Sequence, residues 1–218
     1  KNAATPILAA CLLTQEECVI HNVPDISDVA KMLELLRQLG VSVKQTGSTV
    51  LVRAQNVTLQ QLDRKLIKAM RSSLLLFGPL LARLGEVKLP EPGGCIIGRR
   101  PLDAHLQGLA QLGVAISSKD DSYVLQVVAK LTGAHIVLPE FSVTATENVL
   151  MAAVGAVGQT IIDTAATEPH VQDLCNFLVA MGARIHGIGT HHLVADGVTE
   201  FRGTTHTLIP DSTEAGTW

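Results

Sequence analysis

One cysteine in this chain lies where a thiol could do chemistry. Cys95 stands in the segment 89–101, LPEPGGCIIGRRP, and Arg99 and Arg100 follow it within five residues. Glycine lets backbone and ligand approach closely because it has no Cβ, and nearby cations lower the pKa of a thiol and make it reactive at neutral pH. Three prolines and three glycines in this segment predict a loop, where functional residues are commonly found. The segment therefore predicts a functional loop with Cys95 as its reactive group.

Positive charge is concentrated around this loop. The net charge is −3, yet residues 64–100 hold eight Lys and Arg against two Glu. An acidic protein that gathers its cations in one segment is suited to a small anion. A nucleic-acid partner is not expected, because such proteins usually have a wider basic face with stacking aromatics, and only 3% of the residues in the whole chain are aromatic. A solvated basic helix face is the alternative.

Arg100 adds a second indication of anion binding. It is followed by Pro101 and Asp103, where a helix is predicted to begin. Free N–H groups at a helix start and a bidentate guanidinium both favour phosphate.

The other thiols and the histidines indicate no second site. Cys11 and Cys175 fall in apolar helical patterns and Cys18 opens a strand pattern, so each is interpreted as a small buried side chain. The cysteines have no CxxC spacing, and the eight histidines form no HxH or HxxxH pattern. His191 and His192 are adjacent and would point to opposite faces of a strand. We therefore expect no metal site and no cofactor.

The elements that must hold the loop follow a threefold internal repeat. The sequences LLRQLGVSV, LAQLGVAI and LVAMGARI place glycines at positions 40, 113 and 182. Glycine at such a position ends a helix because it tolerates the left-handed conformation. An aspartate lies nine to twelve residues before each glycine, where the helix is expected to begin and where a carboxylate caps N–H groups and complements the dipole. These aspartates are Asp28, Asp103 and Asp173.

Each repeat is predicted to hold two helices and three strands. An apolar helix precedes each aspartate, at 3–13, 69–84 and 145–157, and a short strand follows it, at 18–22, 86–89 and 160–163. After each glycine, two alternating runs predict a hairpin, at 42–45 with 49–53, 114–117 with 123–127, and 183–186 with 191–195. Alternating helices and strands predict the α/β class. The first helices are rich in Ala and Leu almost all round, which suggests that they pack together with the sheets outside.

Composition fits a globular protein, with 47% hydrophobic and 17% charged residues. The longest apolar stretch, 74–82, is nine residues and contains Gly78 and Pro79, whereas a membrane span needs about 20. No signal peptide is visible. We therefore expect a cytoplasmic protein with reduced thiols and no membrane contact.

Several motifs resemble those of the UDP-N-acetylglucosamine 1-carboxyvinyltransferases, a family of enolpyruvyl transferases. PGGCIIGRRP at 92–101 is similar to the family's active-site loop, and KNAA at 1–4 resembles its Lys-Asn pair. MRSS at 70–73 resembles its Met-Arg-(Ala/Ser)-Ser turn, and SVTATEN at 142–148 resembles its second substrate-contacting loop. The ending at 208–217 is similar to its crossover to a second lobe.

The resemblance implies both a fold and a reaction. The fold is an inside-out α/β barrel of three βαβαββ units, in one lobe spanning 1–218 with repeats of about 1–60, 61–130 and 131–205 and a crossover at 206–218. The reaction transfers the enolpyruvyl group of phosphoenolpyruvate to the 3-hydroxyl of UDP-N-acetylglucosamine and releases phosphate, as the first committed step toward bacterial peptidoglycan.

Roles follow residue by residue from the same resemblance. Cys95 is expected to protonate the methylene carbon of phosphoenolpyruvate and to be the site of covalent adducts and of alkylation by fosfomycin. Lys1 and Arg100 are expected to face phosphoenolpyruvate or the nucleotide, Asn2 to orient the sugar, and Arg71 to contact the sugar nucleotide. Preorganised positive charge suits two anionic substrates.

The remaining expected contacts belong to the nucleotide. The uridine end is expected to lie against Arg100, Pro101, Leu102, Asp103 and Ala104. The diphosphate is expected to lie against Ser142 and Val143.

Two positions depart from the family pattern. Glu140 stands where some relatives carry Lys, and a carboxylate cannot pair with a diphosphate. Thr144 stands where many relatives have Gly, which narrows the close approach of backbone to ligand. Family members are also longer, and they close a second lobe over the substrates that brings a base and a further Arg. This chain alone is therefore expected to bind weakly and turn over little.

Three other functions stay open. A shikimate-phosphate enolpyruvyl transferase has the same fold, although its relatives lack the Gly-Gly-Cys loop and Cys95 speaks against it. A non-catalytic sugar-nucleotide-binding or regulatory module could keep the fold without the reaction. A thiol redox sensor is the third, but no resolving cysteine lies near Cys95 in the sequence.

Overall fold

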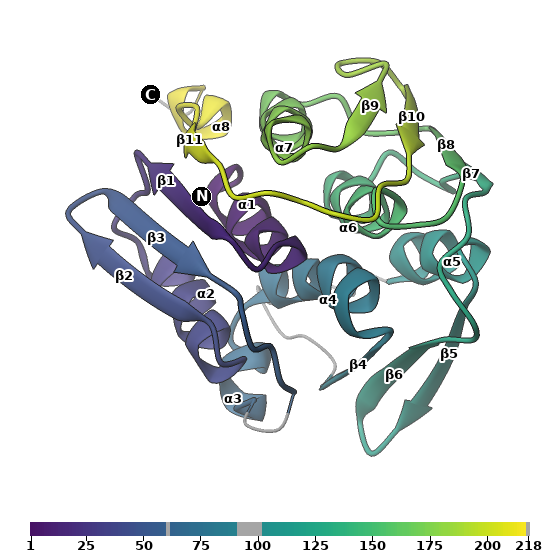
Figure 1. The fold of residues 1–218 in the computed structure, drawn as a ribbon, viewed down its shortest axis with the longest axis horizontal. Helices are drawn as coiled ribbons and strands as arrows, with labels where there is room; N and C mark the ends of the chain where they lie inside the picture. Colours follow the sequence, from purple (N-terminus) through teal and green to yellow (C-terminus); the bar gives the residue numbers. More distant parts are fainter. Residues whose placement is uncertain (60–61, 91–101, 217–218) are drawn as a thin grey trace.

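Three repeated units surround a common centre, with helices inside and sheets outside (Figure 1). The computed structural model describes residues 1–59, 62–90 and 102–216. Figure 1 shows α1, α4 and α6 near the middle and the three sheets at the periphery. The structure is therefore a mixed α/β fold with the inside-out arrangement that the buried helices predict.

The elements follow the predicted order with few changes. The first unit comprises α1 (Ala4–Ala10), the 3₁₀ turn η1 (Cys11–Leu13), β1 (Glu17–His21), α2 (Ser27–Gln38), β2 (Ser42–Thr46) and β3 (Thr49–Arg53). The second comprises α3 (Arg64–Lys68), the 3₁₀ helix η2 (Arg71–Leu76), α4 (Phe77–Leu84), β4 (Glu86–Pro90), α5 (Asp103–Gln111), β5 (Val114–Lys119) and β6 (Ser122–Val127). The third comprises β7 (His135–Val137), α6 (Val143–Ala153), β8 (Gln159–Asp163), α7 (Pro169–Ala180), β9 (Arg184–His186) and β10 (His192–Asp196). The chain ends in β11 (Thr205–Thr207) and α8 (Ser212–Ala215).

Each unit contributes one sheet. The strand orders are β11-β1-β3-β2, β4-β6-β5 and β7-β8-β10-β9. Strands within a unit pair antiparallel, apart from β7, which runs parallel to β8. The crossover strand β11 runs parallel to β1, with Val19 opposite Thr205. Strand β11 therefore completes the sheet of the first repeat.

Backbone hydrogen bonds repeat with the sequence. The glycines at 40, 113 and 182 all have positive φ, at +85°, +91° and +108°, which confirms their prediction as helix ends. In each unit the chain that leaves the hairpin returns to the carbonyl of the residue before that glycine. These bonds are Thr58 N to Leu39 O at 2.9 Å, Thr132 N to Leu112 O at 3.0 Å and Arg202 N to Met181 O at 3.0 Å.

The prediction that an aspartate caps each of these helices is wrong in detail. Asp28 and Asp103 lie in the first turns of α2 and α5, but neither caps the helix through its side chain. Asp173 is the fifth residue of α7, which instead begins at Pro169, a residue suited to the first helical position. Asp173 is buried and holds the crossover: its carboxylate contacts His206 Nε2 at 3.0 Å and accepts the N–H of Ile209 at 3.3 Å.

Close helix packing at the centre depends on glycine. A Cβ on Gly78 of α4 would lie 2.2 Å from the carbonyl oxygen of Asn148 in α6. A Cβ on Gly108 of α5 would lie 2.5 Å from Val149 Cγ2, also in α6. Because α6 is wholly buried from residue 145 to 153, neither partner can move aside without disturbing the core.

No helix in the described ranges is both long and apolar enough to cross a bilayer.

We predict that Gly78→Ala destabilises the protein by roughly 2–3 kcal/mol, because the added methyl overpacks the contact between α4 and α6. The free energy of unfolding, measured by urea denaturation, should fall accordingly. Gly216→Ala is the control, since a Cβ there meets its nearest atom, Ser212 O, at 3.4 Å. Equal stability of the two variants would contradict the tight packing at Gly78.

Candidate active site

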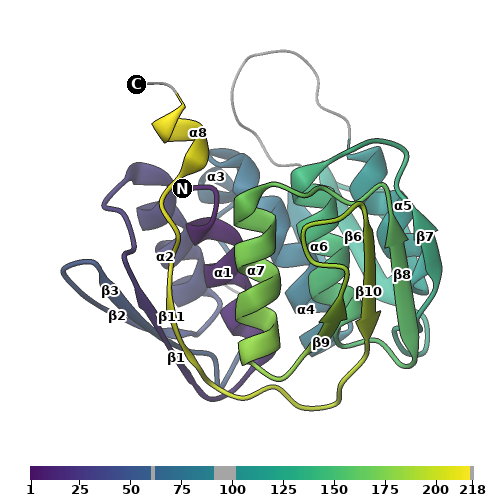
Figure 2. The same cartoon turned by 90° about the horizontal axis from the view of Figure 1, so that it is seen from above.

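The inner helices begin at one end of the lobe, which is the upper end in Figure 2. Two contacts join helix starts at this end. Lys1 Nζ lies 3.0 Å from Asp28 Oδ2, which joins the starts of α1 and α2. Asp211, the N-cap of α8, accepts the N–H of Asn2 at 3.2 Å. Free N–H groups and the positive ends of the helix dipoles make such a surface suited to anions.

We call this surface the helix-start face and define it by the first turns of α1, α2, η2, α5, α6 and α7. The predicted ligands that the structure describes lie in or directly before these first turns: Lys1, Asn2, Arg71, Leu102, Asp103, Ala104, Ser142 and Val143. The contact of His105 with Thr144 brings the starts of α5 and α6 together. The predicted residues Cys95, Arg99, Arg100 and Pro101 lie outside the described residues.

The predicted ligands differ in how much of their side chain is available. Lys1 and Asp103 are exposed, and Arg71 is half-buried. Leu102 and Ala104 are only 6% and 3% exposed. The last two therefore support the start of α5 from within and have little side-chain surface to offer a ligand.

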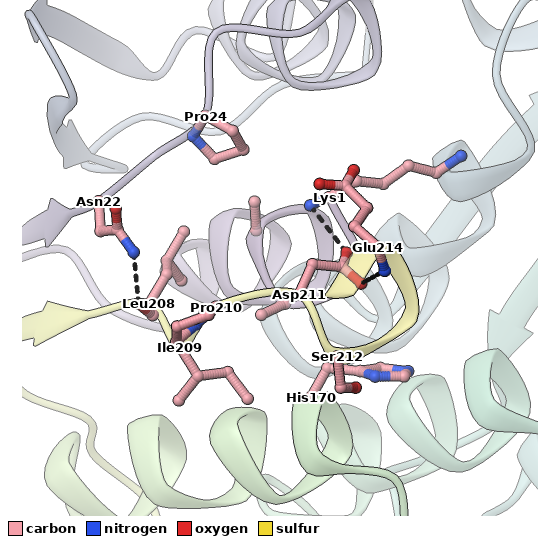
Figure 3. Close-up of a pocket in the computed structure, with 12 residues that line it drawn as sticks. Lys1, Asn22, Pro24, His170, Leu208, Ile209, Pro210, Asp211, Ser212 and Glu214 are labelled. Carbon is pink, nitrogen blue, oxygen red and sulfur yellow. Dashed lines mark hydrogen bonds and ion pairs between the residues drawn. The ribbon is translucent and has the colours of Figure 1, made fainter. Parts of the chain in front are cut away.

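Lys1 and Asn2 are held by neighbouring carboxylates. Besides the ion pair of Lys1 with Asp28, the Asn2 side-chain amide donates to Asp211 Oδ1 at 3.3 Å. A pocket of about 140 Å³ lies beside them, lined by the start of α1, by His170 at the start of α7 and by the crossover residues 208–212 and 214 (Figure 3). The crossover therefore fixes the position of the predicted sugar-orienting residue.

A buried polar network joins the starts of η2, α5 and α6. Asn148 Oδ1 accepts the N–H of Gly78 at 2.7 Å, and its Nδ2 donates to Leu74 O at 2.7 Å. The same Nδ2 lies 3.1 Å from His105 Nδ1, and His105 Nε2 lies 3.1 Å from Thr144 Oγ1. Burial, and secondly the positive charge of Arg71, lower the pKa of His105 to about 4. The ring is therefore neutral at pH 7.

Ser142 has a structural role that the sequence did not reveal. Its hydroxyl caps α6 by accepting the N–H of Ala145 at 3.4 Å, and its carbonyl accepts the N–H of Thr146 at 2.9 Å. Within the described residues the N–H groups of Val143 and Thr144 have no hydrogen-bond partner. The backbone of this turn, more than the Ser142 side chain, is thus available to an anion.

Sequence reasoning missed three residues of this surface. His105 gave no spacing signal, although its place two residues after Asp103 at a helix start put it beside the ligands. Asp28 was interpreted only as a residue that caps the helix and complements its dipole, and not as a partner of Lys1. Phe141 is 65% exposed, its ring centroid is 4.6 Å from that of His191, and its position directly before Ser142 was the available signal.

The other cysteines and histidines are accounted for within the fold. Cys11, Cys18 and Cys175 are buried, as predicted. On the third sheet, His135 and His192 contact the two oxygens of Asp163 at 2.5 and 2.6 Å. In the part of the chain that the structure describes, no group of three or more His, Cys, Asp or Glu side chains could hold a metal ion.

Comparison with known proteins identifies the fold. Residues 1–218 match the EPSP synthase (3-phosphoshikimate 1-carboxyvinyltransferase) family. The chain belongs to this family. The enolpyruvyl transferase NikO from Streptomyces tendae superposes with a TM-score of 0.85 at 25% identity, over 100% of this chain and 52% of that one. The family is thus established at a coarser level than the resemblance of the sequence motifs implies.

Two structures of EPSP synthase from Acinetobacter baumannii share the fold. One has a TM-score of 0.73 at 19% identity, over 99% of this chain and 49% of its own. The other has a TM-score of 0.77 at 18% identity, over 99% and 50%. The chain therefore spans about half the length of the solved structures it matches.

The neutral state of His105 predicts a pH dependence of stability. Because its folded pKa of about 4 lies below the ordinary 6.5, this group contributes stability above pH 6.5 that is lost as the pH falls toward 4. The slope should approach about 1.4 kcal/mol per pH unit in that window. Urea unfolding at pH 7, 6 and 5 measures it.

The matched variants are His105→Gln and His186→Gln, since His186 is exposed. His105→Gln should be less stable at pH 7 and should lose part of the slope between pH 6.5 and 5. His186→Gln should keep the slope. An unchanged slope in His105→Gln would contradict a neutral, buried ring.

Proposed function

We propose that the protein transfers the enolpyruvyl group of phosphoenolpyruvate to the 3-hydroxyl of UDP-N-acetylglucosamine and releases phosphate, in the cytoplasm, at the start of peptidoglycan precursor synthesis. The observation that carries the proposal is the contact between the first turns of α5 and α6, through His105 and Thr144 and near Arg71, in an enolpyruvyl transferase-family fold. Family membership supports the enolpyruvyl chemistry, and the Gly-Gly-Cys segment supports this acceptor.

The chemistry is assigned to the thiol. Cys95 gives its proton to the methylene carbon of phosphoenolpyruvate, which makes the neighbouring carbon electrophilic. The sugar hydroxyl attacks that carbon and loses its proton to a base, and loss of a proton from the new methyl group then expels phosphate. Arg99 and Arg100, four and five residues after Cys95, supply positive charge close to the thiol in sequence.

The helix-start face supplies the electrostatics of binding. Both substrates are anions, and Lys1 and Arg71 carry fixed positive charge beside the N–H groups of α5 and α6. His105 stays neutral and so adds no further charge. The cations and helix starts stabilise the charge that moves from the enolpyruvyl group to the leaving phosphate.

A second lobe completes the site in this proposal. The chain spans about half the length of the structures it matches. The sequence motifs assign no carboxylate near Cys95 as the base for the sugar hydroxyl. The second lobe then brings the base for the sugar hydroxyl and a further Arg, and closure over the substrates excludes water. This chain alone binds the nucleotide weakly and turns over slowly.

Shikimate 3-phosphate is the second candidate acceptor. The matching family carries the name of the shikimate enzyme, and that acceptor is also an anion. The Gly-Gly-Cys sequence at 93–95 favours the sugar nucleotide.

We predict that fosfomycin alkylates Cys95 once per chain and that UDP-N-acetylglucosamine accelerates the reaction, whereas shikimate 3-phosphate does not. Intact-mass spectrometry follows the adduct over time. Cys95→Ala should give no adduct, because Cys11, Cys18 and Cys175 are buried. Acceleration by shikimate 3-phosphate alone would favour the second candidate, and no adduct on protein whose thiols react with a general reagent would contradict the role of Cys95.

A further inference from the structure

Asn148 fixes the direction of a hydrogen-bond relay toward the helix-start face. A backbone N–H can only donate and a carbonyl can only accept. Because Gly78 N donates to Asn148 Oδ1 and Leu74 O accepts from Asn148 Nδ2, the orientation of the amide is determined. The second hydrogen of Nδ2 therefore points to His105 Nδ1, 3.1 Å away. His105 Nδ1 must be the acceptor in this pair.

The tautomer of His105 follows from that bond. The ring is 2% exposed and neutral at pH 7, so it carries a single proton. With Nδ1 accepting, this proton sits on Nε2, which then donates to Thr144 Oγ1 at 3.1 Å. Thr144 is thereby the acceptor of the last bond in the relay.

The hydroxyl hydrogen of Thr144 has no partner among the residues that the structure describes. Thr146, two residues further along α6, donates its hydroxyl hydrogen to Ser142 O at 2.8 Å. Thr144 makes no such bond to a preceding carbonyl in the described part of the chain. Thr144 is also half-buried and lies in the first turn of α6, beside the two N–H groups that lack partners. Its hydroxyl is therefore available as a donor on the surface where anions are expected.

We propose that the Thr144 hydroxyl, oriented by His105 and Asn148, donates a hydrogen bond to a phosphoryl oxygen of the nucleotide that binds at the start of α6. This inference rests on the proposed function, because it takes the ligand to be a nucleoside diphosphate. His105 and Asn148 are positioning residues, since they act through Thr144.

The arrangement accounts for a residue that departs from the family pattern. Many relatives have Gly at the position of Thr144, and any side chain there limits how closely the backbone can approach a ligand. Here the Thr144 side chain prevents that close approach, but it supplies a hydrogen-bond donor. Its oxygen already accepts a hydrogen bond from His105. Hydrogen bonds to charged groups are stronger than those between neutral groups, and a donor fixed in advance loses little entropy on binding.

The first test compares UDP with uridine on the wild-type protein, Thr144→Val and Thr144→Ser by isothermal titration calorimetry. UDP and uridine share base and ribose and differ in the diphosphate. Thr144→Val removes the hydroxyl and keeps the branched shape, so UDP should bind about tenfold more weakly, the effect of losing one hydrogen bond to a charged group. Uridine binding should not change. Thr144→Ser retains the hydroxyl and should bind UDP within about twofold of wild type.

The outcomes distinguish a failure of the Thr144 inference from a failure of the proposed acceptor. Wild-type protein that binds UDP, with equal affinity in Thr144→Val, overturns the role of Thr144 and leaves the proposed acceptor standing. Wild-type protein that binds no UDP, while fosfomycin still alkylates Cys95, overturns the acceptor and the inference together. Equal weakening of UDP and uridine in Thr144→Val also overturns the inference, because it indicates a general disturbance of the site.

A second measurement tests the relay without any ligand. Nitrogen NMR of the imidazole ring in wild-type protein should show the His105 proton on Nε2 at pH 7. A proton on Nδ1 would reverse the relay and overturn the proposal. This readout does not depend on whether the Thr144 variants fold normally.

Discussion

The side-chain amide of Asn148 is the interaction on which the centre of this fold depends. It is buried, and it satisfies the N–H of Gly78, the carbonyl of Leu74 and one nitrogen of His105. Without it the buried N–H of Gly78 and Nδ1 of His105 would lose this partner, and a buried polar group left without a partner costs about 1–3 kcal/mol. The carbonyl of Leu74 would keep only the N–H of Phe77. Because the three groups belong to α4, η2 and α5, one side chain of α6 sets the positions of all of them. Gly78 permits the close contact that this amide requires.

The same constraint links packing to the site. The predicted ligands lie directly before or at the starts of α1, η2, α5 and α6; they are Lys1, Arg71, Asp103 and Val143. Packing that aligns the buried helices therefore also aligns their first turns, and with them the N–H groups and cations. The crossover adds a second link, because Asp211 holds Asn2 and Asp173 holds the chain near β11. The segment that contains β11 and α8 is thus tied directly to the start of α1 and to α7.

Much of this architecture could be predicted from the sequence, because repetition makes local signals reinforce each other. The helix-ending glycines at 40, 113 and 182 and the hairpins after them were placed correctly, since backbone conformation alone determines them. Asp173 was misassigned because its role is tertiary: it serves the crossover and not its own helix. His105 was missed for the same reason, as its partners are distant in sequence. The motifs placed Thr144 in the site, but only the contact with His105 indicates what its side chain can do.

The most direct test of a nucleotide site on the helix-start face is a titration of the ¹⁵N-labelled chain with UDP-N-acetylglucosamine, followed by backbone amide NMR. It detects weak binding, which is what one lobe is expected to show. We expect the largest shift changes at the starts of α1, η2, α5 and α6, among them the amides of Asn2, Arg71, Asp103 and Thr144. Changes confined to the outer faces of the sheets or to the opposite ends of these helices would contradict the account, as would a spectrum that does not change at saturating ligand.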